Sequence, residues 1–465
     1  MAEEKSVSEM VEVKWRDIRE KWRESQPFTI FRVPAYIRES NRTAYEPRMV
    51  SIGPYYHGGG ALRGMEEYKR RYMKDLLSRF SGDADGNADD TAESTLLKKM
   101  RGLQARALAC YSECPVPPPP PVGKADDFFA EMLLMDGCFI LEFFFKWHEK
   151  NSDTLSAVTW VRTLVLYDLL LIENQIPFFV LEALYGAIAG EQGNRQLLLN
   201  LLVEYIEAEI KPSSEPSAGM KVNHLLHLYY GCFVPKTAKD GVVVITIPWP
   251  PNPKDAPEPK TRTIPRATEL LEAGVTFVRC EVPVGDRPAA RCFGMFAKDK
   301  VAPDRFDVTF DRRTGVMKIP TIEIDDMKLP LLINLIAFEQ TLCGEKPRLL
   351  TSYVALMSKL IVTARDVELL RRHRIVESLL ADDEEAAQFF SRLGNVGTMD
   401  YERQAFFDLY KDVRHYCDSS WHRYRATLHR DYFSNPWSAI SVVVAAFLVA
   451  LTIAQTYFAV YPSKN

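Results

Sequence analysis

The residues best suited to chemistry lie in the polar motif IENQIP, residues 172–177, inside an otherwise apolar stretch. A carboxylate placed there, Glu173, could act as a general base in a ligand-binding or catalytic site. The alternative is a junction between two helices, in which Asn174 and Gln175 bond to orphan backbone groups before Pro177 starts the next helix. We favour the junction, because polar groups within an apolar run must find hydrogen-bond partners.

A second carboxylate, Glu339, occurs near the end of another apolar segment, in the motif AFEQ. If Glu173 and Glu339 met in space, they could work as an acid/base pair, and Asp136 could contribute to the same pocket. This arrangement would make the protein a carboxylate-dependent enzyme such as a hydrolase. The sequence does not bring the three carboxylates together, so we assign no catalytic residue.

Other residues that could bind a metal ion or a phosphate lack the spacing of known binding motifs. His224 and His227 are three residues apart, whereas a zincin-type motif has two histidines four residues apart and an intervening glutamate. Cys110 and Cys114 lack partners at the spacing of a metal site. The glycines of residues 58–60 do not follow a predicted strand, as those of a phosphate-binding loop do. We therefore predict no metal-binding or cofactor-binding residue.

The elements that would position these residues are mainly helical. The predicted fold is a mainly α body with a small β-hairpin region and one C-terminal transmembrane helix. We expect a β-strand at 275–280 and a hairpin formed by 306–310 and 316–319. The predicted segments are an N-terminal amphipathic helix (1–27), one helical body (28–433) with linkers at 81–94, 113–124 and 234–262, and the transmembrane helix (437–461). Within the body, the apolar helices of 126–190 and 329–393 are expected to pack together.

Five consecutive prolines, residues 117–121, lie inside the second linker. Such a tract adopts a polyproline II helix, which can dock on an aromatic groove of a partner protein. A stiff spacer is the alternative interpretation, and it is the one we favour.

The C-terminal segment has the composition of a membrane anchor. No charged residue occurs in 437–461, and the 22 residues from Ala439 to Val460 would span about 33 Å as a helix. A lipid bilayer has a hydrocarbon core of about 30 Å, so this length is sufficient. The alternative is a buried core helix. We predict a tail-anchored, single-pass membrane protein.

The charges that flank the anchor predict its orientation. Arg423, Arg425 and Arg430 precede the anchor, and only Lys464 follows it. The positive-inside rule then places the large N-terminal body in the cytosol, at the plasma membrane or an endomembrane. The first 25 residues contain no apolar secretory signal.

The net charge and the cysteines bear on nucleic-acid binding and on the redox compartment. A net charge of −4 gives no indication of nucleic-acid binding. The eight cysteines include no CxxC pair and fit reduced thiols in a cytosolic protein, although an even number would also fit disulfides in a lumenal domain.

A series of motifs is similar to the plant family known as domain of unknown function 247. The similarity begins with Val33-Pro34, YEP at Tyr45 and SIGP at Ser51, and covers residues 28–458. Further motifs follow in the same order: EMLLMDGCFILEFF from Glu131, DLLLIENQIPFFVLEALY from Asp168, ATELLEAGVTFV from Ala267, NLIAFEQ from Asn334, SYVALMSKLIVTARDVELL from Ser352 and YFSNPWSAISVVVAAFLVALTIAQTYF from Tyr432.

The resemblance implies a helical body with one C-terminal membrane helix, and it implies no particular reaction or cofactor. Some grass members of the family are linked to self-incompatibility, in which pollen and stigma recognise self. The resemblance therefore favours a recognition or signalling role through unidentified protein partners. A carboxylate-dependent enzyme remains the alternative.

Overall fold

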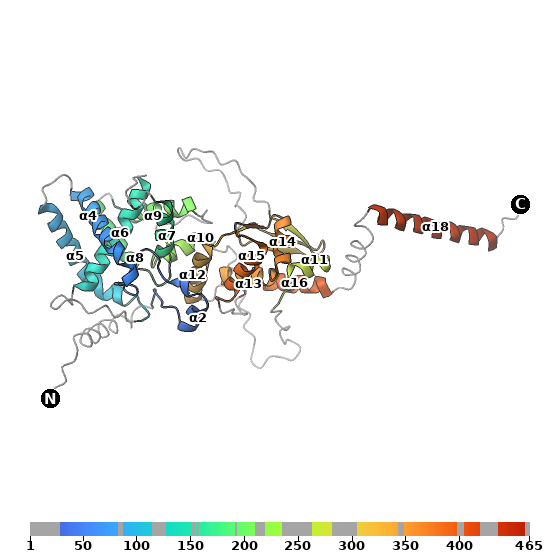
Figure 1. Cartoon of the computed structure of the whole chain (residues 1–465), viewed down its shortest axis with the longest axis horizontal. Helices are drawn as coiled ribbons and strands as arrows, with labels where there is room; N and C mark the ends of the chain where they lie inside the picture. Colours follow the sequence, from blue (N-terminus) through green and yellow to red (C-terminus); the bar gives the residue numbers. More distant parts are fainter. Residues whose placement is uncertain are drawn as a thin grey trace, which may run out of the picture. The chain divides into compact units, whose positions relative to one another are not determined.

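The protein is mainly helical. The computed structural model describes residues 28–81, 87–113, 127–149, 155, 158–190, 193–209, 219–234, 263–280, 305–342, 348–397, 404–418 and 436–460. The predicted N-terminal helix (1–27), the proline tract (117–121) and most of the predicted linkers 113–124 and 234–262 lie outside these residues. Figure 1 shows the helices and strands along the chain.

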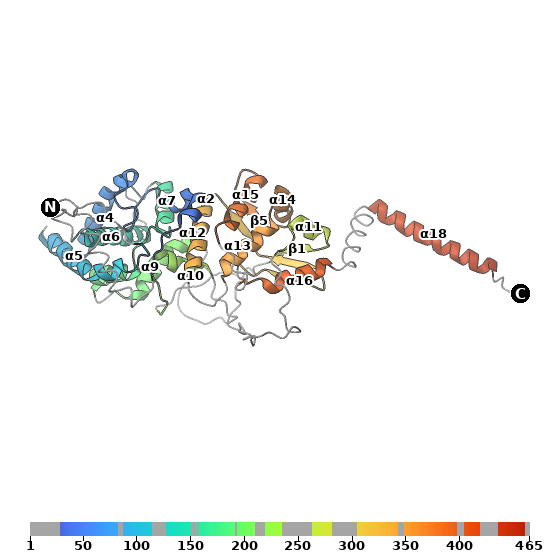
Figure 2. The ribbon, with the colours of Figure 1, turned by 90° about the horizontal axis from the view of Figure 1, so that it is seen from below.

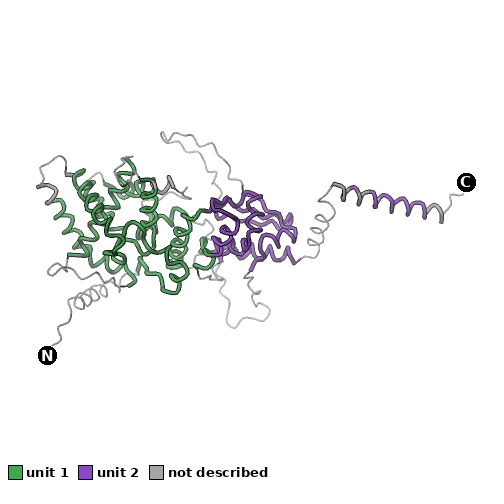
Figure 3. Tube along the Cα trace, in the orientation of Figure 1, with its two compact units in different colours: residues 1–249, 325–351, 392–399 green, residues 250–324, 352–391, 400–465 purple. Residues whose placement is uncertain are grey.

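The described residues form two compact units (Figure 3). Unit 1 comprises residues 1–249, 325–351 and 392–399, and unit 2 comprises 250–324, 352–391 and 400–465. The helices of 126–190 belong to unit 1 together with residues 325–351, whereas residues 352–391 belong to unit 2, so the expected packing of 126–190 with most of 329–393 stays a prediction. Hydrophobic periodicity shows that a helix is buried, but it does not show which other helices share its core.

Unit 1 is built around α6 (Phe128–His148), which is apolar on nearly all sides and has most of its residues buried. A helix with this pattern belongs at the centre of a core. It packs against α4, α5, α8 and α9 (Figures 1 and 2). The helices of unit 1 are α2 (Ala35–Ser40), α3 (Arg42–Tyr45), η1 (Gly60–Leu62), α4 (Arg63–Ser81), α5 (Asn87–Leu108), α6, α7 (Thr159–Leu169), α8 (Phe178–Ala189), α9 (Arg195–Glu209), α10 (Leu225–Phe233) and α12 (Lys328–Thr341).

One predicted linker is shorter than the sequence indicated. Helix α5 begins at Asn87, so the second half of the predicted linker 81–94 is helical. The segment has no apolar period, which is why it resembles a linker. Alanine and glutamate in it, such as Ala92 and Glu93, nevertheless favour a helix by their intrinsic propensity.

Unit 2 contains the β structure. Its helices and strands are α11 (Ala267–Glu272), β1 (Thr276–Arg279), β2 (Thr309–Asp311), β3 (Val316–Ile319), β4 (Ile322–Ile324), α14 (Ala364–Arg372), β5 (Val376–Ser378) and α16 (Phe407–Asp418), and α13 (Leu349–Leu360) and α15 (Asp383–Gly394) lie mostly in it. The predicted strand at 275–280 and the predicted hairpin are confirmed as β1 and as the antiparallel pair β2–β3. Strand β1 pairs with β3 in parallel, which places β3 at the centre of the sheet.

A second, two-stranded sheet in unit 2 escaped the sequence analysis. Strand β4 pairs in parallel with β5, with Ile322 opposite Val376. Each strand has three residues, which is too short for an alternating pattern to be read. A parallel pair also needs no turn sequence between its strands, so no hairpin signal marks it.

The C-terminal segment forms one helix, α18 (Pro436–Val460) (Figure 1). Several of its large apolar side chains are exposed, including Phe447 at 63% and Ile453 at 65%. Over the residues that the structure describes, no helix reaches the length and apolarity required for crossing a membrane. The transmembrane role expected for 437–461 therefore stays a prediction.

Candidate functional site

The polar residues that the sequence singled out meet an N-terminal segment of unit 1, residues 28–56, which we call the strap. The strap contains Pro34, Pro47 and Pro54 and only two short helices, α2 and α3. Because it forms no long helix or sheet, many of its backbone N–H groups have no partner within the strap. Buried backbone donors need acceptors, and the buried core of unit 1 supplies them.

Asp168, in the last turn of α7, is the main acceptor for the middle of the strap. Its carboxylate accepts hydrogen bonds from the backbone N–H groups of Arg48 (2.9 Å), Met49 (2.6 Å) and Val50 (2.8 Å). The residue is only 2% exposed. Burial raises the pKa of Asp168 to about 6, and the backbone hydrogen bonds oppose this rise. All of the contacts hold the strap in place.

Glu173 binds both ends of the strap. It accepts hydrogen bonds from the backbone N–H of Val33 (2.6 Å) and from the hydroxyl of Tyr56 (2.7 Å), and it pairs with the guanidinium of Arg38. The side chain of Glu173 is 1% exposed. A general base needs a lone pair that faces a substrate, whereas both oxygens of Glu173 are engaged by groups of the protein itself.

Asn174 joins the strap to the end of α7. Its Oδ1 accepts a hydrogen bond from the backbone N–H of Ile52 (2.7 Å), and its Nδ2 donates to the carbonyls of Val50 (3.0 Å) and Asp168 (2.8 Å). Asn174 is fully buried, so these bonds satisfy polar groups that water does not reach.

Gln175 closes the junction between α7 and α8. Its Nε2 donates to the carbonyls of Leu169 (2.7 Å) and Leu171 (2.8 Å), which lie at and just beyond the end of α7. Its Oε1 accepts a hydrogen bond from the backbone N–H of Leu226 (3.2 Å), in the first turn of α10. This geometry confirms the predicted helix junction at 172–177.

Asp136, on α6, forms a buried ion pair with Lys69 on α4, at 2.7 Å. Lys69 also donates to Glu66 (2.8 Å), and its side chain has no exposed surface. The other oxygen of Asp136 accepts a hydrogen bond from the N–H of Gly53 in the strap (2.8 Å). Gly53 has a φ of +73°, and a Cβ there would lie 2.4 Å from the carbonyl oxygen of Gln175. Only glycine fits this approach without strain.

Glu339, near the end of α12, belongs to a separate set of contacts in unit 1. It accepts hydrogen bonds from the hydroxyl of Tyr230 (2.6 Å) and from the backbone N–H groups of Leu350 (3.0 Å) and Thr351 (2.7 Å). Among the described residues, Glu339 and Glu173 have no hydrogen-bond partner in common. The structure therefore gives no support to an acid/base pair formed by these two carboxylates.

The comparisons with known proteins agree with the motifs that form these contacts. A family of plant proteins of unknown function, DUF247, matches residues 30–451, which include all but the first two residues of the strap. The chain belongs to this family.

The relatives of this DUF247 chain are similar over nearly their whole length. A UPF0481 protein of Arabidopsis thaliana, At3g47200, is 25% identical over 452 residues, which cover 94% of this chain and 87% of the relative. A putative UPF0481 protein of the same plant, At3g02645, is 23% identical over 506 residues, which cover 94% of this chain and 90% of the relative. No solved structure matches the chain significantly.

His224 and His227 serve helix α10. The Nδ1 atom of His224 accepts a hydrogen bond from the backbone N–H of His227 (3.3 Å) and so caps the helix. Both rings contact Phe338. Burial lowers the pKa of His224 to about 3 and that of His227 to about 4, so both imidazoles are neutral at physiological pH. No group of three or more potential metal ligands occurs among the described residues.

Of the other weak candidates, Cys110 contacts the strap through its backbone, since its carbonyl accepts hydrogen bonds from the N–H groups of Thr29 and Ile30, both at 2.9 Å. Cys110 is half-buried at the end of α5, and burial raises the pKa of its thiol. Cys114 lies outside the described residues. Residues 58–60 lead into η1 rather than following a strand.

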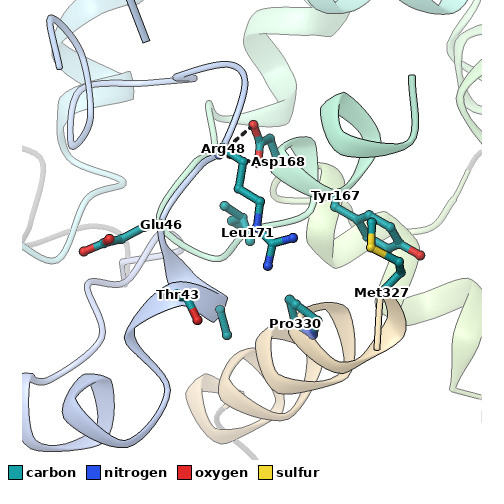
Figure 4. Close-up of a pocket in the computed structure, with 9 residues that line it drawn as sticks. Thr43, Glu46, Arg48, Tyr167, Asp168, Leu171, Met327 and Pro330 are labelled. Carbon is teal, nitrogen blue, oxygen red and sulfur yellow. Dashed lines mark hydrogen bonds between the residues drawn. The ribbon is translucent and has the colours of Figure 1, made fainter. Parts of the chain in front are cut away.

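A small pocket adjoins Asp168 between the strap, α7 and α12 (Figure 4). It is lined by residues of the strap, α7 and α12, among them Arg48, Tyr167 and Pro330. Its free volume is about 10 Å³, which is room for about one water molecule. A pocket of this size does not hold an organic substrate.

The sequence did not single out Asp168, Lys69 or Asn334 as members of this network. Lys69 follows Met65 by four residues and precedes Met73 and Leu76 by four and seven, so it lies on the buried face of α4. This placement of a lysine in an apolar stripe was a readable signal. Asn334 on α12 donates to the carbonyl of Ala44 (2.7 Å) and accepts from the N–H of Ile172 (2.9 Å), and no signal in its own motif identifies these partners.

Proposed function

We propose that this protein is a non-enzymatic recognition or interaction protein, attached to a membrane by its C-terminal helix. The observation that carries the non-enzymatic part is the use of the carboxylates in unit 1. Asp168, Glu173 and Glu339 accept hydrogen bonds from backbone or hydroxyl groups of the protein. These carboxylates therefore stabilise the fold. The link of some grass members of the family to self-incompatibility supports a recognition role.

The alternative, a carboxylate-dependent hydrolase, can be separated from this proposal by Glu173→Gln and Glu339→Gln. Each substitution keeps the shape of the side chain and removes its charge. If the protein is an interaction protein, each variant that stays folded should still bind its partners. Cross-linking in plant membranes followed by capture of the variant should then yield the same partner proteins as capture of the parent. A variant that stays folded, recovers these partners and still loses all biological activity would favour the enzyme.

Two observations support membrane attachment. The segment 437–461 contains no charged residue, and α18 exposes large apolar side chains such as Val449, at 59%. Exposed apolar surface of this extent is unfavourable in water and favourable in lipid. The partner of this segment would be the hydrocarbon core of a bilayer.

We expect Val449→Lys to weaken membrane attachment. A lysine at the centre of a membrane-spanning helix costs about 2.5–3.5 kcal/mol of insertion free energy. The measurement is the fraction of protein that stays with membranes after carbonate extraction, and Val449→Leu is the matched control. Removal of residues 437–465 should release a soluble protein with its remaining helical signal intact. Equal retention of the lysine variant and the parent would show that another part of the chain attaches the protein.

We further propose that the body lies on the cytosolic side, as the arginines before the anchor indicate. Asn41-Arg42-Thr43 is a glycosylation sequon at the start of α3, where Asn41 is partly exposed and Thr43 is exposed. Glycosylation occurs in the secretory lumen, so we expect glycosidase treatment of the plant-expressed protein to leave its mass unchanged. A mass shift that disappears in Asn41→Gln would place the body in the lumen or outside the cell.

A further inference from the structure

A cluster of five charged side chains joins α4 to α6, apart from the contacts of the strap. Helix α4 contributes Asp75 and Arg79, and α6 contributes Glu142, Lys146 and Glu149. Arg79 donates two hydrogen bonds to one oxygen of Glu142, at 3.0 and 2.8 Å, and one to Glu149. Lys146 donates to Asp75 at 2.7 Å and lies 3.9 Å from the same oxygen of Glu142.

Glu142 is the unusual member of this cluster. Its side chain has no exposed surface, whereas Asp75 is 38% exposed and Glu149 is 42% exposed. Both cations lie against its Oε1 atom, and its Oε2 atom is buried with no hydrogen-bond partner among the described residues. A buried carboxylate oxygen without a donor is unfavourable as an anion and becomes acceptable when it carries a proton.

The balance of charge in the cluster also favours a proton on Glu142. With every group ionised, three carboxylates face two cations. One bound proton would neutralise the excess negative charge. The favoured position for this proton is the Oε2 atom of Glu142, because protonation there also relieves a buried acceptor that has no donor. Burial raises the pKa of Glu142 to about 7, Arg79 and Lys146 oppose this rise, and Asp75 adds to it.

The other helices that pack against α6 also bring charged groups, and those of α8 and α9 are paired. Helix α5 contributes Glu93, whose charge acts on Cys138, one turn before Glu142. Glu182 of α8 pairs with Arg195. Glu204 of α9 pairs with His148.

We infer that Glu142 is a proton-binding site that makes the contact between α4 and α6 respond to pH near neutrality. When the proton binds Oε2, Arg79 keeps its hydrogen bonds to Oε1 and to Glu149, and the excess charge disappears. When the proton leaves, a buried oxygen carries charge without a donor. The contact between the two helices is therefore tighter in acid and looser in base.

The direction of the effect follows from linkage. The pKa of Glu142 in the folded protein, about 7, lies above the ordinary value of a glutamate, 4.5. The proton on Glu142 therefore stabilises the contact between α4 and α6 fully at a pH below the ordinary glutamate pKa, and this stabilisation is lost as the pH rises through about 7. Between these two values, the equilibrium constant for local opening should rise by up to about tenfold per pH unit, because opening releases one proton.

The test is hydrogen exchange of the full-length protein in detergent micelles between pH 5 and pH 8, read on peptides from α4 and α6. After correction for the intrinsic exchange rate, opening of these helices should increase with pH. Glu142→Gln keeps an acceptor for Arg79 and cannot titrate, so we expect a shallower pH slope. Glu67→Gln, at an exposed position of α4 outside the cluster, should keep the slope of the parent. Burial also raises the pKa of Asp168, but this residue is present in all three proteins, so the difference in slope reports Glu142.

A second measurement keeps the inference testable if Glu142→Gln does not fold. In the parent labelled with ¹³C at the glutamate carboxyls, one carboxyl signal should titrate with a midpoint above pH 6. The inference is overturned if every glutamate carboxyl titrates below pH 5.5, or if Glu142→Gln opens with the same pH slope as the parent.

Discussion

Replacement of Lys69 by methionine is expected to lower the free energy of unfolding of unit 1 by about 3–5 kcal/mol, because it leaves a buried carboxylate without its cation. Methionine has nearly the length of lysine and removes the charge together with its N–H donors. Asp136 would then keep one donor, the N–H of Gly53, and would lose the ammonium group at 2.7 Å. Burial already raises the pKa of Asp136, and Lys69 is the main influence that opposes this rise.

A second substitution shows whether the unpaired charge causes the loss. Asp136→Asn removes the charge and keeps an acceptor for Gly53, so Lys69→Met combined with Asp136→Asn should recover part of the stability. The measurement is urea-induced unfolding of the full-length protein in detergent, read by hydrogen exchange on α4 and α6. Arg42→Ala, which breaks the exposed pair with Glu46, is the control and should change nothing measurable. The ion pair would not be structural if Lys69→Met unfolded at the same urea concentration as this control.

Replacement of Asp168 by alanine should cost about 3 kcal/mol or more, because three buried N–H donors of the strap lose their acceptor at once. These donors belong to Arg48, Met49 and Val50, and they have carboxylate oxygens within 2.6–2.9 Å. The adjoining pocket holds room for about one water, which limits how many of the three donors solvent can satisfy.

Asp168→Asn is the matched control for this effect. The amide oxygen of asparagine can take the place of Oδ2, to which all three N–H groups donate. We therefore expect a much smaller loss of stability than in Asp168→Ala, together with retention of the strap. Hydrogen exchange of peptides from residues 44–53 provides the readout. If residues 44–53 are equally protected from hydrogen exchange in the alanine and asparagine variants, Asp168 does not stabilise the strap by accepting its backbone hydrogen bonds.

The sequence by itself determined the family, most of the elements and the burial of the polar motif. The motifs from YEP to NLIAFEQ lie within the residues that match DUF247. The strand at 275–280 and the hairpin of β2 and β3 were readable because a turn and flanking β-formers lie within one short window. The junction at 172–177 was readable for a similar reason, since polar residues beside a proline inside an apolar run have few structural uses.

Only the tertiary structure decided what the buried polar residues hold. Asp168 and Asn174 bind a strap about 120 residues earlier in the chain, and Asn334 binds Ala44 across 290 residues. The same distance in sequence hides the division into two units, since residues 325–351 return to unit 1 after the chain has built part of unit 2. Hydrophobic periodicity and turn signals act over a few residues, whereas these bonds depend on the folding of the intervening chain. The sequence therefore indicates that a buried carboxylate such as Asp168 has a partner, and the fold decides that this partner is a set of backbone N–H groups of the strap.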